Sequence, residues 1–234
     1  MGAQSVNPVF CAIDTPDLPE AQKLVEALSD TIGGIKLGLE FFMAHGAEGY
    51  RVLADKGLPI FLDVKLHDIP NTVAGALKSL LPLKPSFITL HASGGTAMMQ
   101  AARDAVANAG AGRPKLLAVT VLTSLDSKDL SSVGQAADPT AQVVRLAQLA
   151  KESGMDGAIC SPAEIPALRA ALGKDFILMV PGIRPAWTQA NDQKRTLTPS
   201  QAMKAGATFL VIGRPITKAE SPAEAARRIG TELA

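Results

Sequence analysis

Eight short apolar runs, separated by helix-like segments, constrain the fold of this chain more than any other feature of its sequence. Each run has four to eight residues and is almost continuously hydrophobic, which is typical of strands covered on both faces. The runs are Val9–Asp14, Gly34–Gly38, Pro59–Leu66, Phe87–Ala92, Leu116–Leu122, Gly157–Ser161, Phe176–Val180 and Phe209–Ile212. Strands that alternate with helices over 234 residues predict an α/β fold, a (β/α)8 TIM barrel formed as a single domain by residues 1–234.

Helix-start signals follow several of these runs. Ser161-Pro-Ala-Glu164 and Ser221-Pro-Ala-Glu224 have the capping-box pattern with proline at the first helical position, and Thr198-Pro-Ser-Gln201 has a third. An open, doubly wound sheet is the alternative arrangement. No glycine-rich dinucleotide fingerprint follows the first run and no GxxxxGK[ST] pattern occurs, so the closed barrel is favoured.

Composition and charge exclude several classes of function. Lys plus Arg number 23 against 22 for Asp plus Glu, and this balance gives no reason to expect a nucleic-acid partner. No apolar run approaches the ~18 residues of a membrane span, and the first eight residues do not resemble a signal peptide. Both cysteines, Cys11 and Cys160, stand in apolar stretches and are predicted to be buried thiols. We therefore expect a cytoplasmic protein with no membrane association.

Paired charges interrupt the third apolar run. Side chains alternate along a strand, so Asp63 and Lys65 are expected on the face opposite Leu62 and Val64. The apolar face must meet the helices, and the two charged side chains are then predicted to point into the barrel near its carboxyl-terminal mouth. An unpaired buried charge costs several kcal/mol, so opposite charges are expected to meet there.

Further charged residues extend this group onto neighbouring strands. Lys36 lies in the adjacent apolar run and is expected beside Asp63, while Asp14 ends the first run and Asp68 follows Lys65 by three residues. The result is an alternating Lys36, Asp63, Lys65, Asp68 array at one mouth. Salt bridges that only stabilise the barrel are the alternative, but charge arrays of this kind are typical of active sites.

A second polar group is predicted after the seventh and eighth strands, where barrel enzymes bind phosphate. Gly213 allows a backbone N–H to approach an anion, and Arg214 can bind it with two hydrogen bonds. The long segment Gly182–Leu197 adds Arg184, Gln193, Lys194 and Arg195, together with the only tryptophan, Trp187. An ordinary glycine turn with a surface arginine is the alternative. The cations of the long loop favour a phosphorylated ligand, and a long loop here is a candidate lid.

At these residues the sequence resembles the orotidine 5′-phosphate decarboxylase family, of the bacterial type. The most specific match is Asp63-Val-Lys-Leu-His-Asp-Ile-Pro-Asn-Thr72. Further matches are Ala12–Asp14, Lys36–Gly38, His91–Gly95, Val119–Ser124, Val180–Arg184 and Ile212–Ile216. The DxKxxD core alone is shared with sugar-phosphate decarboxylases and aldolases on related barrels.

The resemblance implies conversion of orotidine 5′-phosphate to uridine 5′-phosphate, the last step of de novo UMP synthesis, with no cofactor and no metal. It implies that Lys65 donates the proton to the ring carbanion and that Lys36, Asp63 and Asp68 hold it in place. It also implies a homodimer in which Asp68 and Thr72 reach into the partner's site. The substrate-binding residues that it implies are Asp14, Lys36, Asp63, Thr72, Thr123, Arg184, Gln193, Gly213 and Arg214.

Two other functions remain open from the sequence. A metal-dependent sugar-phosphate decarboxylase or aldolase would use the same acidic residues to hold a divalent ion. A barrel that binds nucleotides without converting them, as a sensor or scaffold, would have no need of buried charge. The complete Lys36, Asp63, Lys65, Asp68 set disfavours this second possibility.

Overall fold

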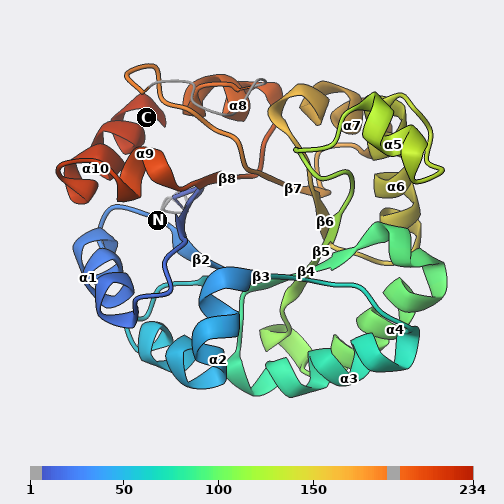
Figure 1. Cartoon of the computed structure of the whole chain (residues 1–234), viewed down its shortest axis with the longest axis horizontal. Helices are drawn as coiled ribbons and strands as arrows, with labels where there is room; N and C mark the ends of the chain where they lie inside the picture. Colours follow the sequence, from blue (N-terminus) through green and yellow to red (C-terminus); the bar gives the residue numbers. More distant parts are fainter. Residues whose placement is uncertain (1–6, 189–195, 234) are drawn as a thin grey trace.

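A closed barrel of eight parallel strands forms the centre of the protein (Figure 1). The computed structural model describes residues 7–188 and 196–233. Each strand pairs with its neighbours in sequence, and β1 pairs with β8 to close the ring. The strands are β1 Val9–Ile13, β2 Gly34–Gly38, β3 Ile60–Leu66, β4 Phe87–His91, β5 Lys115–Val119, β6 Gly157–Ile159, β7 Ile177–Val180 and β8 Phe209–Ile212. The predicted (β/α)8 architecture is confirmed.

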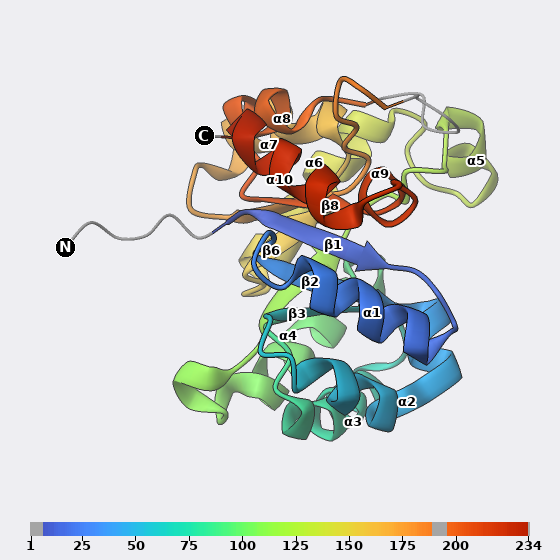
Figure 2. The same ribbon diagram turned by 90° about the vertical axis from the view of Figure 1, so that its left-hand side faces the viewer.

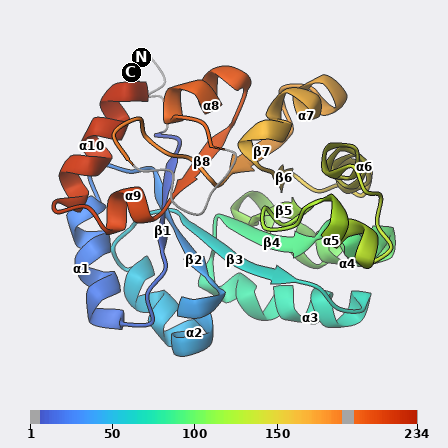
Figure 3. The same cartoon turned by 45° about the horizontal axis from the view of Figure 1, so that its top comes forward.

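Helices surround the barrel and cover the outer face of every strand pair (Figures 1 and 3). The α-helices are α1 Leu18–Leu28, α2 Leu39–Ala54, α3 Pro70–Leu80, α4 Gly95–Ala107, α5 Ser127–Ser132, α6 Pro139–Glu152, α7 Ile165–Leu172, α8 Pro199–Ala205, α9 Arg214–Thr217 and α10 Pro222–Leu233. Single 3-10 turns occupy Leu81–Leu83, Ala92–Gly94, Gly110–Gly112 and Pro162–Glu164. The last helix, α10, packs against α1, α8 and α9, and it thereby joins the two ends of the helical layer.

Several predicted runs extend beyond the strands that they contain. β2 and β8 have the predicted bounds, whereas β1, β4, β5 and β6 end one to three residues early. The extra residues serve the next element: Ala92 begins a 3-10 turn, and the Ser161 N–H donates to Glu164 Oε2 at 2.6 Å. The predicted loop after β5 contains the short helix α5, because Asp126 and Asp129 form a capping box at its start.

Two apolar layers support the barrel. The larger one lies between strands and helices and includes the fully buried Tyr50, Phe41 and Leu62. The smaller one fills the barrel interior, where Phe10 packs edge-on against Phe87 and Phe209, with ring centroids 5.5 Å apart in each pair. This interior layer closes the barrel below the mouth, so polar side chains that point inward can meet only above it.

The carboxyl ends of the strands open on one side of the barrel. In Figure 2 the arrowhead of β1 points to the side on which α5 and α9 lie. Both cysteines are buried in the strand layer, as predicted, and burial raises the pKa of the Cys11 thiol to about 12. Within residues 7–188 and 196–233, no helix has the length and apolar character needed to cross a membrane.

Candidate active site

A break in the strand ladder brings Asp63 and Lys65 together at the mouth of the barrel. Leu62 of β3 pairs with Ile88 of β4, but the next paired residues are Leu66 and Leu90, so β3 contains extra residues between the two pairs. Lys65 has a φ of +49°, in the left-handed region that L-residues with side chains seldom adopt. The Lys65 ammonium lies 2.8 Å from Asp63 Oδ2, and their side chains are 28% and 15% exposed. The predicted meeting of opposite charges is confirmed for this pair.

Thr89 of β4 completes a ring of hydrogen bonds around this pair. Its hydroxyl donates to Asp63 Oδ1 at 2.9 Å and accepts the backbone N–H of Lys65 at 2.9 Å. Thr89 is fully buried. Sequence reasoning did not select it, although a polar residue inside the apolar run Phe87–Ala92 was a visible signal.

Lys36, which was expected beside Asp63, forms its ion pair with Asp14. Its ammonium lies 2.6 Å from Asp14 Oδ1, and the residue is only 8% exposed. The two oxygens of Asp63 accept hydrogen bonds from Lys65 and Thr89. Gly38 makes room for the Lys36–Asp14 pair, because a Cβ there would lie 2.9 Å from Lys36 Nζ. Since Gly38 is opposite Asp63 in the β2–β3 ladder, the two ion pairs are neighbours.

Asp68 and Thr72 follow β3 and lie on the surface of the chain. Both are exposed, and Asp68 Oδ1 accepts the backbone N–H of Ile69 at 2.7 Å. Ile69, between them, is an apolar residue that is 67% exposed. Asp63 and Lys65 meet, while the Asp68 carboxylate accepts a hydrogen bond from its sequence neighbour beside an exposed apolar side chain.

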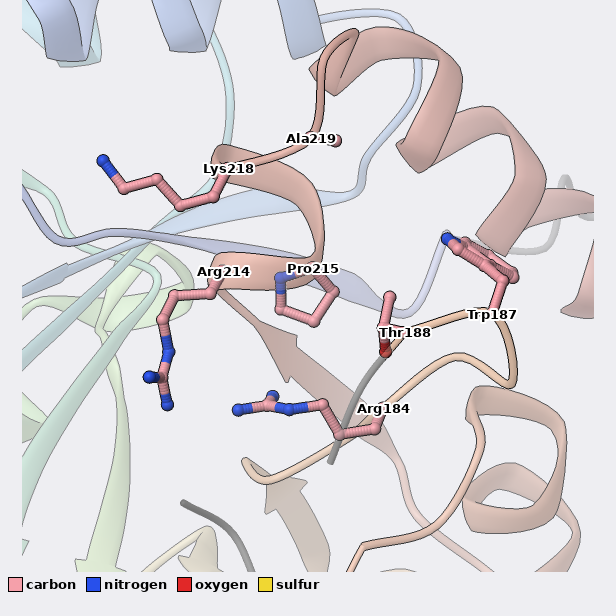
Figure 4. A pocket seen from close by; sticks show the side chains of 7 residues that line it. All are labelled: Arg184, Trp187, Thr188, Arg214, Pro215, Lys218 and Ala219. Carbon is pink, nitrogen blue, oxygen red and sulfur yellow. The ribbon is translucent and has the colours of Figure 1, made fainter. Parts of the chain in front are cut away.

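A cationic pocket lies at the ends of β7 and β8 (Figure 4). Its lining includes Arg184, Trp187, Thr188, Arg214, Pro215 and Lys218. The guanidinium groups of Arg184 and Arg214 point toward the same space, whereas the Lys218 ammonium points away from it. Arg184 is buried and donates to the Ile183 carbonyl at 3.0 Å, and Arg214 is exposed. Two like charges aimed at one space favour an anionic ligand there.

The remaining predicted contact residues differ in how close the structure places them to the charged groups. Gly213 lies against β1, where a Cβ would come within 3.3 Å of Ala12 Cβ and 3.9 Å of Asp14 Oδ2. Thr123 is exposed in the loop that follows β5. Gln193, Lys194 and Arg195 lie outside the described residues.

Gly213 links the two polar groups into one surface. It directly precedes Arg214 of the cationic pocket, and it lies close to the Asp14 carboxylate. Asp14 pairs with Lys36, and Gly38 beside this pair is opposite Asp63 in the β2–β3 ladder. The ends of the neighbouring strands β8, β1, β2 and β3 therefore hold Arg214, the Lys36–Asp14 pair and the Asp63–Lys65 pair in turn.

Two histidines border the same mouth. The rings of His67 and His91 are stacked, with centroids 5.1 Å apart. Burial lowers the pKa of His91 below its usual value of 6.5, and the charges of His67 and Lys65 act in the same direction. In the part of the chain that the structure describes, no group of three His, Cys, Asp or Glu side chains is arranged to hold a metal ion.

Comparison with known proteins identifies the family. A sequence model described as "Orotidine 5'-phosphate decarboxylase / HUMPS family" matches residues 7–229. An orotidine 5'-phosphate decarboxylase of Rhodospirillum rubrum is 52% identical, with 100% of this chain and 96% of that protein aligned. One from Paramagnetospirillum magneticum is 53% identical, with 97% of this chain and 99% of that protein aligned.

Solved structures give the same result at the level of the fold. The crystal structure of orotidine 5'-phosphate decarboxylase from Lactobacillus acidophilus superimposes with a TM-score of 0.85 at 39% identity, covering 97% of this chain and 99% of that one. Because the family model covers almost the whole chain and full-length relatives share about half of its residues, this chain belongs to the orotidine 5'-phosphate decarboxylase / HUMPS family.

Proposed function

We propose that this protein decarboxylates orotidine 5′-phosphate to uridine 5′-phosphate and carbon dioxide, as the last step of UMP synthesis. The observation that carries the proposal is the Asp63–Lys65 pair, which lies at a barrel mouth that also contains a cationic pocket. A nucleotide has a phosphate at one end and a reactive ring at the other, and the two polar groups match that division. The names of the full-length relatives support the same substrate.

Lys65 is assigned the central chemical role. When the carbon–carboxylate bond breaks, carbon dioxide leaves and the electron pair stays on the ring carbon. This pair lies in the ring plane and is not delocalised into the π system, so it needs a nearby positive charge. The Lys65 ammonium supplies that charge and then transfers a proton to the carbon. A preorganised charge of this kind contributes ~3–4 kcal/mol by itself, so several such groups must act together.

The other charged groups keep the lysine in place before the reaction starts. The Asp63 carboxylate holds the Lys65 ammonium at 2.8 Å, so little rearrangement is required as charge develops. Lys36, fixed by Asp14, is assigned to the ribose hydroxyls or to the network beside the ring. Thr123 is assigned to the pyrimidine edge, as the family resemblance implies.

Phosphate binding is assigned to Arg184, Arg214, the Gly213 N–H and Gln193. Both guanidinium groups face the same pocket, where each can donate hydrogen bonds to a bound phosphate (Figure 4). The phosphate is remote from the bond that breaks, and its binding energy can be used to orient the ring and exclude water. The segment Gly182–Leu197 is assigned the role of a lid over the bound phosphate.

Two copies of the chain are proposed to build each site. Asp68 and Thr72 are exposed beside Ile69, which is itself 67% exposed and apolar. An interface that covers Ile69 would bury this apolar surface and carry the Asp68 carboxylate to the partner's Lys65. The exposed apolar side chain supports a homodimer with shared sites, as the family resemblance implies.

Mixing two inactive variants tests the shared site. Lys65→Ala and Asp68→Ala chains are each expected to be nearly inactive. After the subunits exchange, mixed dimers should contain one site with both native residues, which restores about one quarter of the wild-type activity. Activity that stays at the level of the separate variants would contradict an Asp68 contribution from the partner.

The proposed reaction is tested by ultraviolet absorbance of orotidine 5′-phosphate with purified protein in excess chelator. We expect a fast spectral change and equal amounts of uridine 5′-phosphate and carbon dioxide. No change with this substrate, together with turnover of a sugar phosphate on addition of magnesium, would replace the proposal with the metal-dependent alternative. Tight binding of uridine 5′-phosphate without any turnover would favour a nucleotide-binding function.

A further inference from the structure

We propose that Thr89 is a positioning residue for this site, because its hydroxyl fixes both the carboxylate of Asp63 and the backbone of Lys65. The inference rests on the proposed function of the Asp63–Lys65 pair. Nothing in the DxKxxD motif includes Thr89, which is on a different strand. The assignment comes from the geometry of β3 and β4 alone.

The hydrogen-bond ladder between β3 and β4 is broken near the ion pair. In a regular parallel pair, the N–H groups of β3 would donate to the carbonyls of its neighbours. Between Leu62 and Leu66 this pattern stops on the β4 side, and the Lys65 N–H donates to the Thr89 hydroxyl instead. A buried N–H without an acceptor costs about 1–3 kcal/mol. By accepting the Lys65 N–H, the Thr89 hydroxyl removes this cost and stabilises the irregular backbone of β3.

The backbone of Lys65 has an unusual, left-handed conformation. A left-handed backbone at a residue with a long side chain costs on the order of 1 kcal/mol and persists only where the surroundings fix it. The φ of +49° directs the chain so that the ammonium folds back to Asp63, two residues earlier. Thr89 is therefore bonded at the residue where the backbone changes direction.

Thr89 and Lys65 hold different oxygens of the Asp63 carboxylate. Asp63 Oδ1 accepts from Thr89, while Oδ2 accepts from the Lys65 ammonium. With one oxygen held by a buried side chain, rotation of the carboxylate is restricted and its other oxygen stays directed at Lys65. Thr89 is itself held by its strand, since it pairs with Leu117 of β5. The hydroxyl thus transmits the rigidity of the barrel to both charged groups.

The test compares Thr89→Val, which keeps the branched shape and removes the hydroxyl, with Thr89→Ser, which keeps the hydroxyl. We expect kcat for orotidine 5′-phosphate to fall by about 100-fold in Thr89→Val, with KM little changed, and to recover most of this loss in Thr89→Ser. The split arises because phosphate contacts that hold the substrate are remote from Thr89. Thr89→Ala repeats the comparison if Thr89→Val does not fold.

Thr208→Val is the matched control. Its hydroxyl also accepts a backbone N–H, from Leu178 at 3.0 Å, and it precedes β8 at the opposite end of the barrel. We expect this variant to lose thermal stability and keep its kcat. The inference is wrong if Thr89→Val retains wild-type kcat. It is also wrong if Thr89→Val and Thr208→Val lose similar amounts of thermal stability and similar amounts of kcat.

A second readout separates this inference from the proposed reaction. Hydrogen exchange of the Lys65 amide should become faster in Thr89→Val but not in Thr89→Ser, whatever the substrate of the protein. If wild-type protein does not convert orotidine 5′-phosphate and this exchange pattern is found, the proposed function fails and the positioning role stands. Unchanged exchange in Thr89→Val would overturn the positioning role.

Discussion

Removing the Arg214 side chain tests how the cationic pocket contributes to the reaction. Arg214 is the exposed member of the guanidinium pair that faces the pocket, and the substitution Arg214→Ala leaves the buried Arg184 in place. A hydrogen bond to a charged group contributes about 1.5–3 kcal/mol, and each 1.36 kcal/mol is tenfold in rate. We therefore expect kcat/KM for orotidine 5′-phosphate to fall about 10- to 150-fold, toward the lower end because water screens an exposed side chain.

The assay uses two substrates and one control variant. Orotidine, which lacks the phosphate, should be converted slowly and at the same rate by wild type and Arg214→Ala, since the missing contact is to the phosphate. Lys218→Ala is the control, because Lys218 lines the same pocket but its ammonium points away and lies 3.9 Å from Glu20. An equal loss with both substrates would mean that Arg214 acts on the ring or the fold. An unchanged kcat/KM for the phosphorylated substrate would refute the phosphate assignment.

Three further predictions concern parts of the fold around the site. Asp156→Asn should lower the Tm by about 4–8 °C at neutral pH, because Asp156 accepts two hydrogen bonds from Arg113 and one from the Leu116 N–H. Burial alone would raise the pKa of Asp156, but these bonds hold it below the usual 3.8, so thermal scans should show the Tm difference narrowing as the pH falls below about 4. A thiol reagent should leave both cysteines unmodified in the native protein and modify both in denaturant, since burial raises the pKa of each; rapid native labelling would contradict this. Fluorescence of Trp187, the only tryptophan, should change when uridine 5′-phosphate is added, and Arg214→Ala should need higher concentrations for the same change; identical titration curves for both proteins would argue against binding in this pocket.

The fold was predictable because its signals are local. A buried parallel strand needs a short, continuous apolar run, and the eight runs Val9–Asp14 to Phe209–Ile212 each overlap one strand of the barrel. Strand ends were less predictable. Ser161, for example, directly follows an apolar stretch, but its backbone N–H bonds to Glu164 in the following helical turn. The charged pair was predictable from alternation along one strand.

Contacts between strands were harder to predict. Lys36 can reach Asp14 or Asp63 from its place on β2, and the choice depends on what else those carboxylates bind. The ladder break at Lys65 depends on how β3 pairs with β4, which no property of either segment alone reveals. Thr89 was missed for the same reason, since its two bonds exist only once the strands are side by side.

The most direct test of the account is the rate of decarboxylation by Lys65→Ala, measured in excess chelator beside wild type. Lys115→Ala is the control, because that lysine lies 3.4 Å from Asp156, away from the mouth. The account predicts that Lys65→Ala loses at least about 10⁴-fold in kcat while it still binds uridine 5′-phosphate, because both charge stabilisation and the proton donor are gone. A Lys65→Ala protein that converts orotidine 5′-phosphate at a rate near that of wild type would contradict the assigned role of Lys65 and with it the mechanism.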